Sequence, residues 1–262
     1  MKRRSFVKTS IISSILPGAA SASMLAENKK EKRQYYELRV YTLKDESQQA
    51  LIENYFEKAA IPALNRIGIK NIGVFKELKP QGQTKMYVLI PFESMEDFVQ
   101  AENKLAADAV YQQAGVNYLQ APATAPAYDR IESSLLFAFE HMPVLAIPQQ
   151  GNRIFELRRY ESASETAGKT KIKVFNEGGE IDIFKSVGLT PVFFGETIIG
   201  GLRPNLTYML TYPDMAAHDA SWKKFVNDPR WLAIKAVPDY ADAKIVSHIT
   251  NTFLVPASCS QI

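Results

Sequence analysis

The chain has 262 residues, of which 46% are hydrophobic and 23% are charged, and its formal net charge at pH 7 is +3. These values are ordinary for a folded globular protein of one or two domains. The positive charge comes from Lys and Arg residues within positions 1–22, because the rest of the chain has 27 Lys and Arg against 28 Asp and Glu. The sequence therefore gives no sign of nucleic-acid binding, and no internal apolar run is long enough to span a bilayer.

The N-terminal segment has the pattern of an export signal. A basic stretch containing Arg3 and Arg4 precedes a mildly apolar run, which ends in a small-residue cleavage site at 20–22. The paired arginines, followed by Ser-Phe-Val-Lys, resemble a twin-arginine signal, which exports folded proteins. We therefore expect residues 1–22 to be a signal peptide, the twin-arginine export machinery to be a partner, and the protein to be periplasmic or secreted. A disordered basic tail is the alternative, and residues 23–34 are predicted to be a flexible lead-in.

The remaining sequence contains a long internal repeat. Residues 36–41 (YELRVY) return as residues 155–160 (FELRRY). A nearly constant offset over several landmarks predicts a duplicated domain. The further landmark pairs, separated by 119 to 121 positions, are Gly68 and Gly188, Ser94 and Asp214, Asp108 and Asp228, and Tyr111 and Trp231.

The first repeat is expected over residues 35–140. Period-2 alternation of β-forming residues predicts strands, and an apolar stripe at helical spacing predicts helices. Pro62 should kink or break the first helix, and Gly68 should end it. Ser94 should cap the second helix, whose apolar face continues to Tyr111. The predicted elements are a strand over 35–43, a helix over 47–66, strands over 71–78 and 84–91, a helix after residue 94 and a strand over 131–139.

The second repeat is expected over residues 152–257, after a linker at 141–151. The Gly178–Gly179 pair should break its first helix, near the place where Pro62 interrupts the first copy. Asp214 should cap the next helix, and Asp228 with Pro229 should restart it. The predicted elements are strands over 153–160, 191–198, 206–212 and 244–255, with a helix over 167–184 and a helical region after residue 214.

The order in each copy, β-α-β-β-α-β, is that of a ferredoxin-like domain, with both helices on one face of an antiparallel sheet. The other face of each sheet must also be covered. Two such sheets can pack face to face, or they can join at their edges into a barrel, which removes exposed strand edges. We therefore predict the α+β class, with two tandem ferredoxin-like domains in one pseudo-symmetric body.

Three stretches resemble the NIPSNAP family: the E-L-R-x-Y core of residues 37–41, the corresponding residues 156–160, and Trp222 to Trp231 (WKKFVNDPRW). The resemblance implies a dimeric α+β barrel, formed here within one chain. That superfamily includes cofactor-independent monooxygenases, haem-degrading enzymes and peroxidases, as well as members of unknown activity. The first repeat departs from the pattern, because Glu102 stands opposite Trp222 and Tyr111 opposite Trp231. If a tryptophan were functional, the two halves would not be equivalent.

The first strand of each copy supplies the candidate ligand-binding residues. Alternating side chains share a face of a strand, so the Glu, Arg and Tyr of each copy should lie together. We expect this polar face to point into the lumen between the two sheets and the apolar face to contact the helices. Tyr87 and Tyr208 could add to the lumen. The candidate residues are Glu37, Arg39, Tyr41, Tyr87, Glu156, Arg158, Tyr160 and Tyr208.

Two interpretations of this face remain open. In the first, the protein binds an aromatic or acidic small molecule between its sheets, with Arg fixing an anion and Tyr stacking or donating a proton. An enzyme of oxidoreductase or lyase type is one form of this interpretation. In the second, the Glu–Arg pairs are structural and the protein is a non-enzymatic binding or scaffolding protein. The ordinary frequency of structural ion pairs favours the second interpretation. A further homo-oligomer is compatible with either.

Other site classes receive little support. The histidines at 141, 218 and 248 lack the spacing of a metal site, and no metal is predicted. Haem binding through His218 or His248 is a subordinate alternative, and no cofactor is otherwise indicated. Cys259 is the only cysteine and is expected in a frayed tail. Trp222 and Trp231 are expected to be core residues. No P-loop, dinucleotide fingerprint or G-x-S-x-G motif occurs in the sequence.

Overall fold

The computed structural model describes residues 32–80, 82–149 and 151–262 of the chain. The predicted signal peptide, residues 1–22, and most of the predicted lead-in, residues 23–34, lie outside these ranges and stay predictions. None of the helices within the described ranges combines the length and the apolar character that a membrane crossing requires.

The first repeat folds in the predicted order. Ser94 begins the second helical segment as predicted, because its Oγ accepts a hydrogen bond of 3.1 Å from the backbone N–H of Asp97. Asp108 caps a separate helix, so the apolar face predicted to reach Tyr111 is divided between two helices. The elements are β1 (Tyr35–Thr42), α1 (Glu46–Tyr55), η1 (Phe56–Ala60), α2 (Ile61–Arg66), β2 (Gly73–Glu77), β3 (Lys85–Phe92), α3 (Met95–Ala106), α4 (Ala109–Ala114), α5 (Val116–Leu119) and β4 (Arg130–Ala138).

The second repeat has the same order with additional helical pieces. Gly179 precedes a new helix after the predicted break, and Asp228 and Pro229 start another as predicted. The last strand begins later than predicted, because residues 242–245 form a helical turn. The elements are β5 (Ile154–Glu161), α6 (Glu165–Asn176), α7 (Glu180–Val187), β6 (Thr190–Ile199), β7 (Asn205–Tyr212), α8 (Met215–Val226), α9 (Pro229–Lys235), η2 (Pro238–Tyr240), α10 (Asp242–Ile245) and β8 (His248–Pro256).

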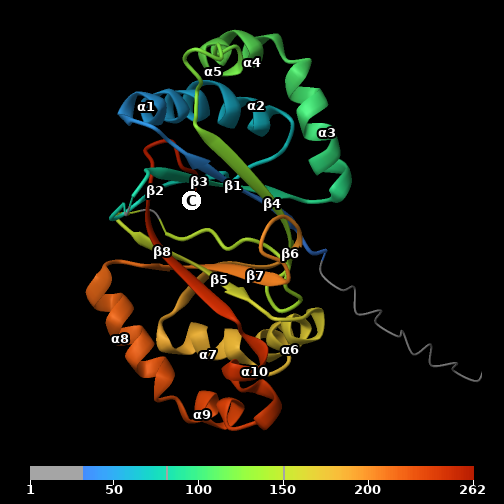
Figure 1. Ribbon diagram of the computed structural model, residues 1–262, viewed down its shortest axis with the longest axis vertical. Helices are drawn as coiled ribbons and strands as arrows, with labels where there is room; N and C mark the ends of the chain where they lie inside the picture. The colour runs from blue at the N-terminus through green and yellow to red at the C-terminus, as the bar shows by residue number, and fades with distance from the viewer. Residues whose placement is uncertain (1–31, 81, 150) are drawn as a thin grey trace, which may run out of the picture. The chain divides into compact units, whose positions relative to one another are not determined.

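The strands of the described residues form one closed barrel in the order β1-β3-β2-β8-β5-β7-β6-β4. The antiparallel pairs β2–β8 and β4–β6 join the two repeats. The structure thus confirms the intramolecular α+β barrel, and of the two predicted arrangements it has the sheets joined at their edges. The helices of the first repeat cover one side of the barrel, and those of the second repeat cover the opposite side (Figure 1).

Pro62 is accommodated by a change of helix type. Residues 56–60 form a π-helical turn, in which the backbone N–H of Ile61 donates to the carbonyl oxygen of Phe56. Pro62 then stands in the first turn of α2. Because proline has no backbone N–H to donate, a wider turn before it keeps the helical run continuous. The predicted interruption is therefore a π-turn, and the Gly178–Gly179 break lies at the equivalent place in the second repeat.

Gly68 ends helix α2 as predicted, and Gly188, its counterpart in the repeat, ends α7 in the same way. Their φ angles are +91° and +93°, in the left-handed region that favours glycine. The residue after each glycine donates its backbone N–H to a carbonyl oxygen of the last helical turn, at 2.9 Å in the first repeat and 3.0 Å in the second. This is the hydrogen bonding of a glycine C-terminal cap, and it directs the chain into the following strand.

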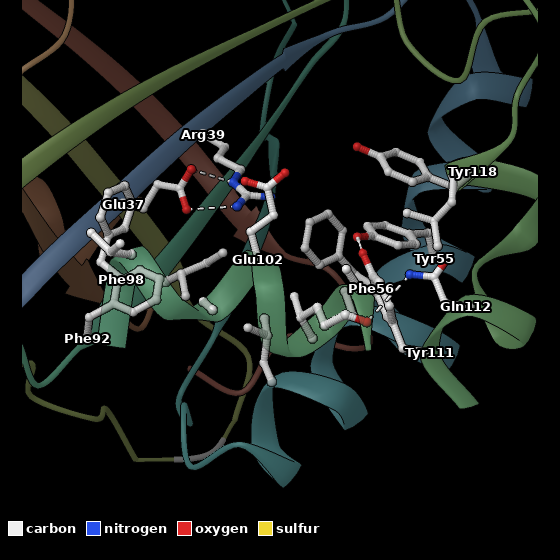
Figure 2. A pocket seen from close by; sticks show the side chains of 18 residues that line it. Glu37, Arg39, Tyr55, Phe56, Phe92, Phe98, Glu102, Tyr111, Gln112 and Tyr118 are labelled. Carbon is white, nitrogen blue, oxygen red and sulfur yellow. Dashed lines mark hydrogen bonds and ion pairs between the residues drawn. The ribbon is translucent and has the colours of Figure 1, made fainter. Parts of the chain in front are cut away.

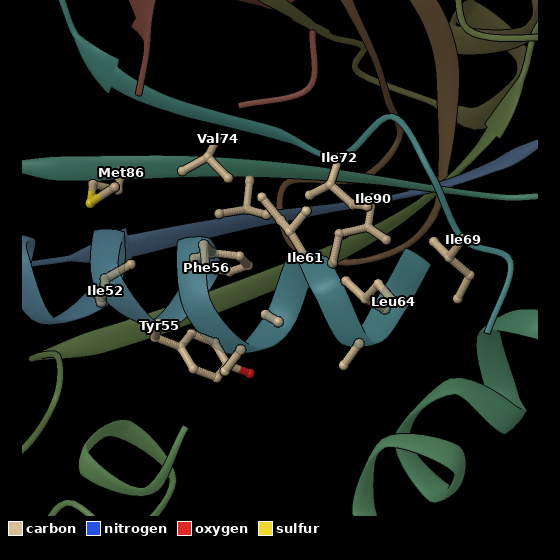
Figure 3. Close-up of a cluster of buried hydrophobic side chains, with 14 of the residues drawn as sticks. Ile52, Tyr55, Phe56, Ile61, Leu64, Ile69, Ile72, Val74, Met86 and Ile90 are labelled. Atoms are coloured by element: carbon tan, nitrogen blue, oxygen red, sulfur yellow. The ribbon is translucent and has the colours of Figure 1, made fainter. Parts of the chain in front are cut away.

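Apolar side chains form separate clusters on the two faces of the barrel wall. In the first repeat, residues such as Ile52, Phe56 and Val74 pack the helices on the sheet (Figure 3). A second cluster lies under the helices of the second repeat and includes Phe184. A third, which we call the lumen cluster, fills the barrel with side chains from both repeats. Its members are Tyr36, Leu38, Phe75, Tyr87, Leu89, Leu136, Ala138, Leu145, Phe155, Leu157, Val192, Phe193, Met209, Leu254 and Ile262.

The linker and the C-terminal tail both pack on the barrel. In the linker, Ala146 donates its backbone N–H to the carbonyl oxygen of Val192 at 2.9 Å. In the tail, Gln261 donates to the carbonyl oxygen of Ile72 at 2.8 Å, and Ile262 is buried in the lumen cluster. The expectation of a frayed tail around Cys259 is therefore wrong, because backbone pairing continues beyond β8 and the cysteine is half-buried.

Candidate functional site

The Glu/Arg/Tyr face of β1 and of β5 points toward the helices. Tyr41 packs in the apolar cluster under α1, and Tyr160 packs in the corresponding cluster of the second repeat. Glu37 and Arg39 line a cavity together with side chains of α3. The orientation predicted from the sequence is thus the reverse of the observed one, and the two sets of polar residues do not meet in one lumen.

The opposite face of the same strands fills the barrel. Tyr36 and Leu38 of β1 and Phe155 and Leu157 of β5 belong to the lumen cluster. The interior of an eight-stranded barrel is just wide enough for side chains to fill it. The centre of the lumen is therefore filled largely by packed apolar side chains. A cavity of about 330 Å³ borders this cluster at Leu38 and Leu136, but none of the eight predicted ligand-binding residues lines it.

Tyr87 and Tyr208 lie on opposite faces, although the sequence suggested that they share one. Tyr87 belongs to the lumen cluster, and its hydroxyl donates to Glu77 Oε1 at 3.2 Å. Tyr208 lies on the helix side and donates to the Tyr160 hydroxyl at 3.1 Å. In the strand register Arg158 pairs with Tyr208, whereas Arg39 pairs with Val88. Only the second repeat therefore has a tyrosine at this position.

Glu37 and Arg39 form a bidentate ion pair on the helix side of β1. Arg39 donates from Nε to Glu37 Oε1 at 2.7 Å and from Nη2 to Oε2 at 2.8 Å, and Ser133 Oγ donates to Oε1 at 2.7 Å. Glu37 is buried, whereas the Arg39 side chain is 30% exposed. Burial by itself would lower the pKa of Arg39, but the hydrogen bond and charge of Glu37 outweigh burial and raise that pKa. Arg39 is therefore cationic and held in place.

A cavity of about 490 Å³ lies over this ion pair, between the sheet and the helices of the first repeat (Figure 2). We call it the α3 cavity. Its volume is within the range of ligand pockets. Phe98 and Leu105 of α3 provide apolar wall. Glu102 lines the cavity but is exposed, so its mouth lies along α3, and the Glu102 side chain extends toward Arg39 (Figure 2).

Paired phenols close the far end of the α3 cavity. The hydroxyls of Tyr55 and Tyr111 are 2.7 Å apart, and those of Tyr41 and Tyr118 are 3.1 Å apart. The Tyr55 and Tyr118 rings stack with centroids 3.8 Å apart. Burial raises the pKa of Tyr41, Tyr55 and Tyr118. Tyr41, Tyr55 and Tyr118 therefore keep their protons and can donate hydrogen bonds.

In the second repeat the corresponding space is occupied by an indole. Glu156 is fully buried and accepts from Arg158 Nη1 at 2.7 Å, Tyr212 Oη at 2.9 Å and Trp222 Nε1 at 3.0 Å. The Arg158 guanidinium lies over the Trp222 ring, 4.7 Å from its centroid. His218 Nε2 is 3.4 Å from the same carboxylate. This side chain network matches the structural interpretation of the Glu–Arg pairs.

The difference between the halves comes from three positions. Helices α3 and α8 each have 12 residues and each follow a capping residue, so Glu102 and Trp222 occupy the same place. Three side chains of the second repeat face Glu156: the indole of Trp222, the imidazole of His218 and the phenol of Tyr212. The residues at the same positions of the first repeat donate no N–H or O–H hydrogen bond to Glu37. These counterparts of Trp222, His218 and Tyr212 are Glu102, Phe98 and Phe92. Of these three differences, the sequence indicated only the exchange of Trp222 for Glu102, because aligning the two repeats pairs these residues.

A buried ion pair on α6 and α7 was not predicted from the sequence. Lys171 and Glu180 have side chains 2% and 3% exposed and lie 3.4 Å apart, and Asp242 lies 3.4 Å from the same Lys171 amine. Burial would lower the pKa of Lys171, but the two carboxylates outweigh it and raise that pKa. Burial raises the pKa of Glu180. The helical spacing of residues could have indicated this burial, because Lys171 lies on the same helix face as the apolar residues Val174 and Phe175.

The histidines do not suit a haem iron in the α3 cavity. His218 is enclosed by the rings of Tyr212 and Phe253, with centroids 5.0 and 5.1 Å away, and His248 is exposed on β8. Neither residue lines the cavity. Within the described ranges, no group of three or more His, Cys, Asp or Glu side chains is arranged to hold a metal ion.

The closed barrel built from two ferredoxin-like repeats, each with its helices outside, defines a dimeric α+β barrel protein. A comparison with protein families matches residues 36–140 and 155–261 to NIPSNAP. The chain therefore belongs to the NIPSNAP family, as the resemblance in its first strands suggested. No protein with a curated description matches it.

Two solved structures share this fold over most of the chain, and a third is similar to part of it. A protein from Fusobacterium nucleatum, provisionally named a monooxygenase, is 10% identical over 86% of this chain and 93% of its own, with a TM-score of 0.56. A similarly named protein from Lactobacillus acidophilus is 12% identical over 86% and 94%, with a TM-score of 0.56. A NIPSNAP family protein from Agrobacterium tumefaciens is 23% identical over 40% and 94%, with a TM-score of 0.36.

Proposed function

We propose that the first repeat binds a small molecule in the α3 cavity. The observation that carries this proposal is the contrast between two equivalent places: a Glu–Arg pair lies under an indole in the second repeat and under a cavity in the first. Evolutionary duplication alone would leave both halves alike, so the open place in the first repeat is the candidate site. The second repeat then has a structural role, in which Trp222 and Tyr212 hold Glu156 and brace the barrel wall.

The site combines features that ligand pockets share. Such pockets are mostly apolar and contain a few fixed polar groups that orient the ligand. Here Phe98 and Leu105 are the apolar part, and Glu37, Arg39 and the phenols are the polar part. The ion pair and the stacked tyrosines are already formed, so little side-chain ordering is required on binding.

A matched pair of variants tests binding. Leu105→Phe places in α3 the residue that α8 carries as Phe225, and it should reduce the cavity with little cost to folding. Val116→Phe adds the same ring at an exposed position that does not line the cavity. Ligand-observed NMR with a panel of neutral aromatic, aliphatic and anionic fragments should detect binders that Leu105→Phe weakens at least several-fold and Val116→Phe leaves unchanged. Absence of any binder, or equal binding by both variants, contradicts the proposal.

We also propose that the chain is exported by the twin-arginine route. The basic stretch, the weakly apolar run and the small-residue site at 20–22 support it. Arg3→Lys with Arg4→Lys keeps the charge and removes the arginine pair. In a bacterial host this double variant should stay in the cytoplasm while the unaltered chain is exported, as followed by fractionation and immunoblotting. Export of the variant at the unaltered level would refute this route.

A further inference from the structure

We propose that the ligand of the α3 cavity is a planar aromatic compound with an N–H or O–H donor, bound as the second repeat binds its own Trp222 side chain. This inference rests on the proposed binding function of the cavity and names the chemical class of its ligand. The Trp222 side chain thus contacts the Glu–Arg pair of the second repeat as a bound aromatic ligand would, while remaining covalently part of the chain.

The second repeat shows how the Glu–Arg pair holds an aromatic ring. The indole N–H of Trp222 donates to Glu156 Oε2 at 3.0 Å. The Arg158 guanidinium lies over the ring, 4.7 Å from its centroid, where a cation interacts favourably with the π electrons. The carboxylate thus selects a donor, and the guanidinium selects a flat ring.

The first repeat keeps both selecting groups and lacks the tethered ring. Glu37 and Arg39 are the third and fifth residues of β1, as Glu156 and Arg158 are of β5. Among the described residues, Glu37 Oε1 accepts from Arg39 and Ser133, whereas Oε2 accepts from Arg39. A carboxylate offers about four acceptor positions, so Oε2 can accept one more donor from the cavity.

The walls of the α3 cavity suit the same ligand. Phe92 and Phe98 line it at the positions of Tyr212 and His218, so two polar side chains are exchanged for aromatic surface. Their rings are 5.3 Å apart at 87°, an edge-to-face arrangement that a further ring can join.

The charges of the cavity disfavour an anionic ligand. Its charged lining residues are Glu37, Arg39 and Glu102, so carboxylates outnumber the guanidinium. Arg39 already uses two donors on Glu37. The earlier expectation that arginine would fix an anion is therefore replaced by a neutral or cationic aromatic donor.

Three related probes test the ligand class on the unaltered protein. Indole has the ring and the N–H, 1-methylindole has the ring without the donor, and indole-3-carboxylate adds a negative charge. Hydrogen bonds to charged groups are strong, so 1-methylindole should bind roughly tenfold to a hundredfold more weakly than indole in calorimetric titrations. Indole-3-carboxylate should also bind more weakly than indole. Equal affinity of indole and 1-methylindole would overturn the inference.

The second test adds a tryptophan side chain to the first repeat and, in a separate variant, removes Trp222 from the second. Glu102→Trp should fill the α3 cavity from within and abolish indole binding, whereas Asn103→Trp, which adds the same ring at an exposed position of α3 that does not line the cavity, should keep it. Glu102 and Asn103 are exposed, so both variants should fold. Trp222→Ala should create a new indole site in the second repeat, seen as a second equivalent of bound indole and a larger rise in Tm with indole than the unaltered protein shows.

The outcomes separate this inference from the binding proposal. One outcome is that other fragments bind, that Glu102→Trp blocks their binding, and that indole does not bind. The cavity is then a ligand site, and the proposed ligand class is wrong. If no fragment binds, both fail. If Trp222→Ala does not fold, the comparison of Glu102→Trp with Asn103→Trp still decides. Indole binding retained in Glu102→Trp overturns the inference, and indole binding lost only in that variant supports it.

Discussion

At the scale of single residues, the same Glu–Arg pair has two different surroundings. Glu156 is enclosed by donors from β5, β7 and α8, whereas Glu37 faces a cavity on one side. A buried charge is tolerated when its partners stay in place. We infer that Glu37, which faces the α3 cavity, is available to bind a ligand. Its counterpart Glu156 instead stabilises the second half of the barrel.

Removing each carboxylate should have unequal effects on stability. Glu156→Ala leaves Arg158 inside the protein without its main partner, so we expect a loss of about 3–5 kcal/mol in the free energy of unfolding. Glu37→Ala should cost less, because Arg39 is 30% exposed and cavity water can solvate it. Urea denaturation of the two variants measures both losses. Equal losses would mean that the α3 cavity is closed to water in solution.

At the scale of elements, local signals predicted most of the chain correctly. Glycine stops, the Ser94 and Asp214 caps and the Asp228–Pro229 restart act through the backbone of a few neighbouring residues, so sequence reveals them. The alternation in β1 likewise showed which side chains share a face. It could not show which face the helices cover, because a closed barrel buries both faces of each strand and each face carries apolar residues.

The candidate site was therefore only half predictable. The repeat comparison identified the Glu–Arg pairs and the substitution of Glu102 for Trp222, and these residues do distinguish the two halves. The location was wrong because polar residues were assigned to the lumen, whereas bidentate pairing allows Glu37 and Arg39 to lie under helices. The phenols of Tyr55, Tyr111 and Tyr118 were not predicted, since they come together only when α1, α4 and α5 pack.

The two glycine stops give a test of element boundaries. Alanine at either site adopts an unfavourable left-handed conformation, which costs about 1–2 kcal/mol. A Cβ at Gly68 would meet open space, whereas a Cβ at Gly188 would lie 2.9 Å from Ser221 Oγ of α8. Gly188→Ala should therefore lower the free energy of unfolding more than Gly68→Ala does. Thermal and urea unfolding of both variants check this, and a Gly188→Ala/Ser221→Ala double variant should remove the difference. If Gly68→Ala is the more harmful, the contact with α8 is not what matters.

At the scale of the whole described body, barrel closure makes the repeats depend on each other. The pairs β2–β8 and β4–β6 cross between them, and the lumen cluster takes side chains from both. Unlike the helix-side clusters, the lumen cluster cannot exist in either repeat alone. We infer that the functional asymmetry arose without loss of this shared interior: the first repeat kept open space outside the barrel wall, and the second kept that space packed.

The burial of tyrosines throughout this body predicts a sharp alkaline limit to stability. Burial raises the pKa of seven of the 12 tyrosines, namely Tyr36, Tyr41, Tyr55, Tyr87, Tyr118, Tyr208 and Tyr212. In the unfolded chain they ionise near pH 10, while in the folded chain they keep their protons. Above that pH the unfolded state binds fewer protons, so stability falls as pH rises.

The magnitude makes this loss abrupt. Each such tyrosine lowers the free energy of unfolding by about 1.4 kcal/mol per pH unit above its unfolded pKa. Seven acting together would exhaust an ordinary stability of about 5–15 kcal/mol within roughly two pH units. The raised pKa of Lys171 acts in the same direction at still higher pH. Urea unfolding between about pH 8 and pH 11 should show the fall, and phenolate absorbance from these residues should appear together with the loss of the folded circular dichroism signal. Full phenolate absorbance in a protein that stays folded would show instead that the phenols around the α3 cavity and in the lumen are open to water.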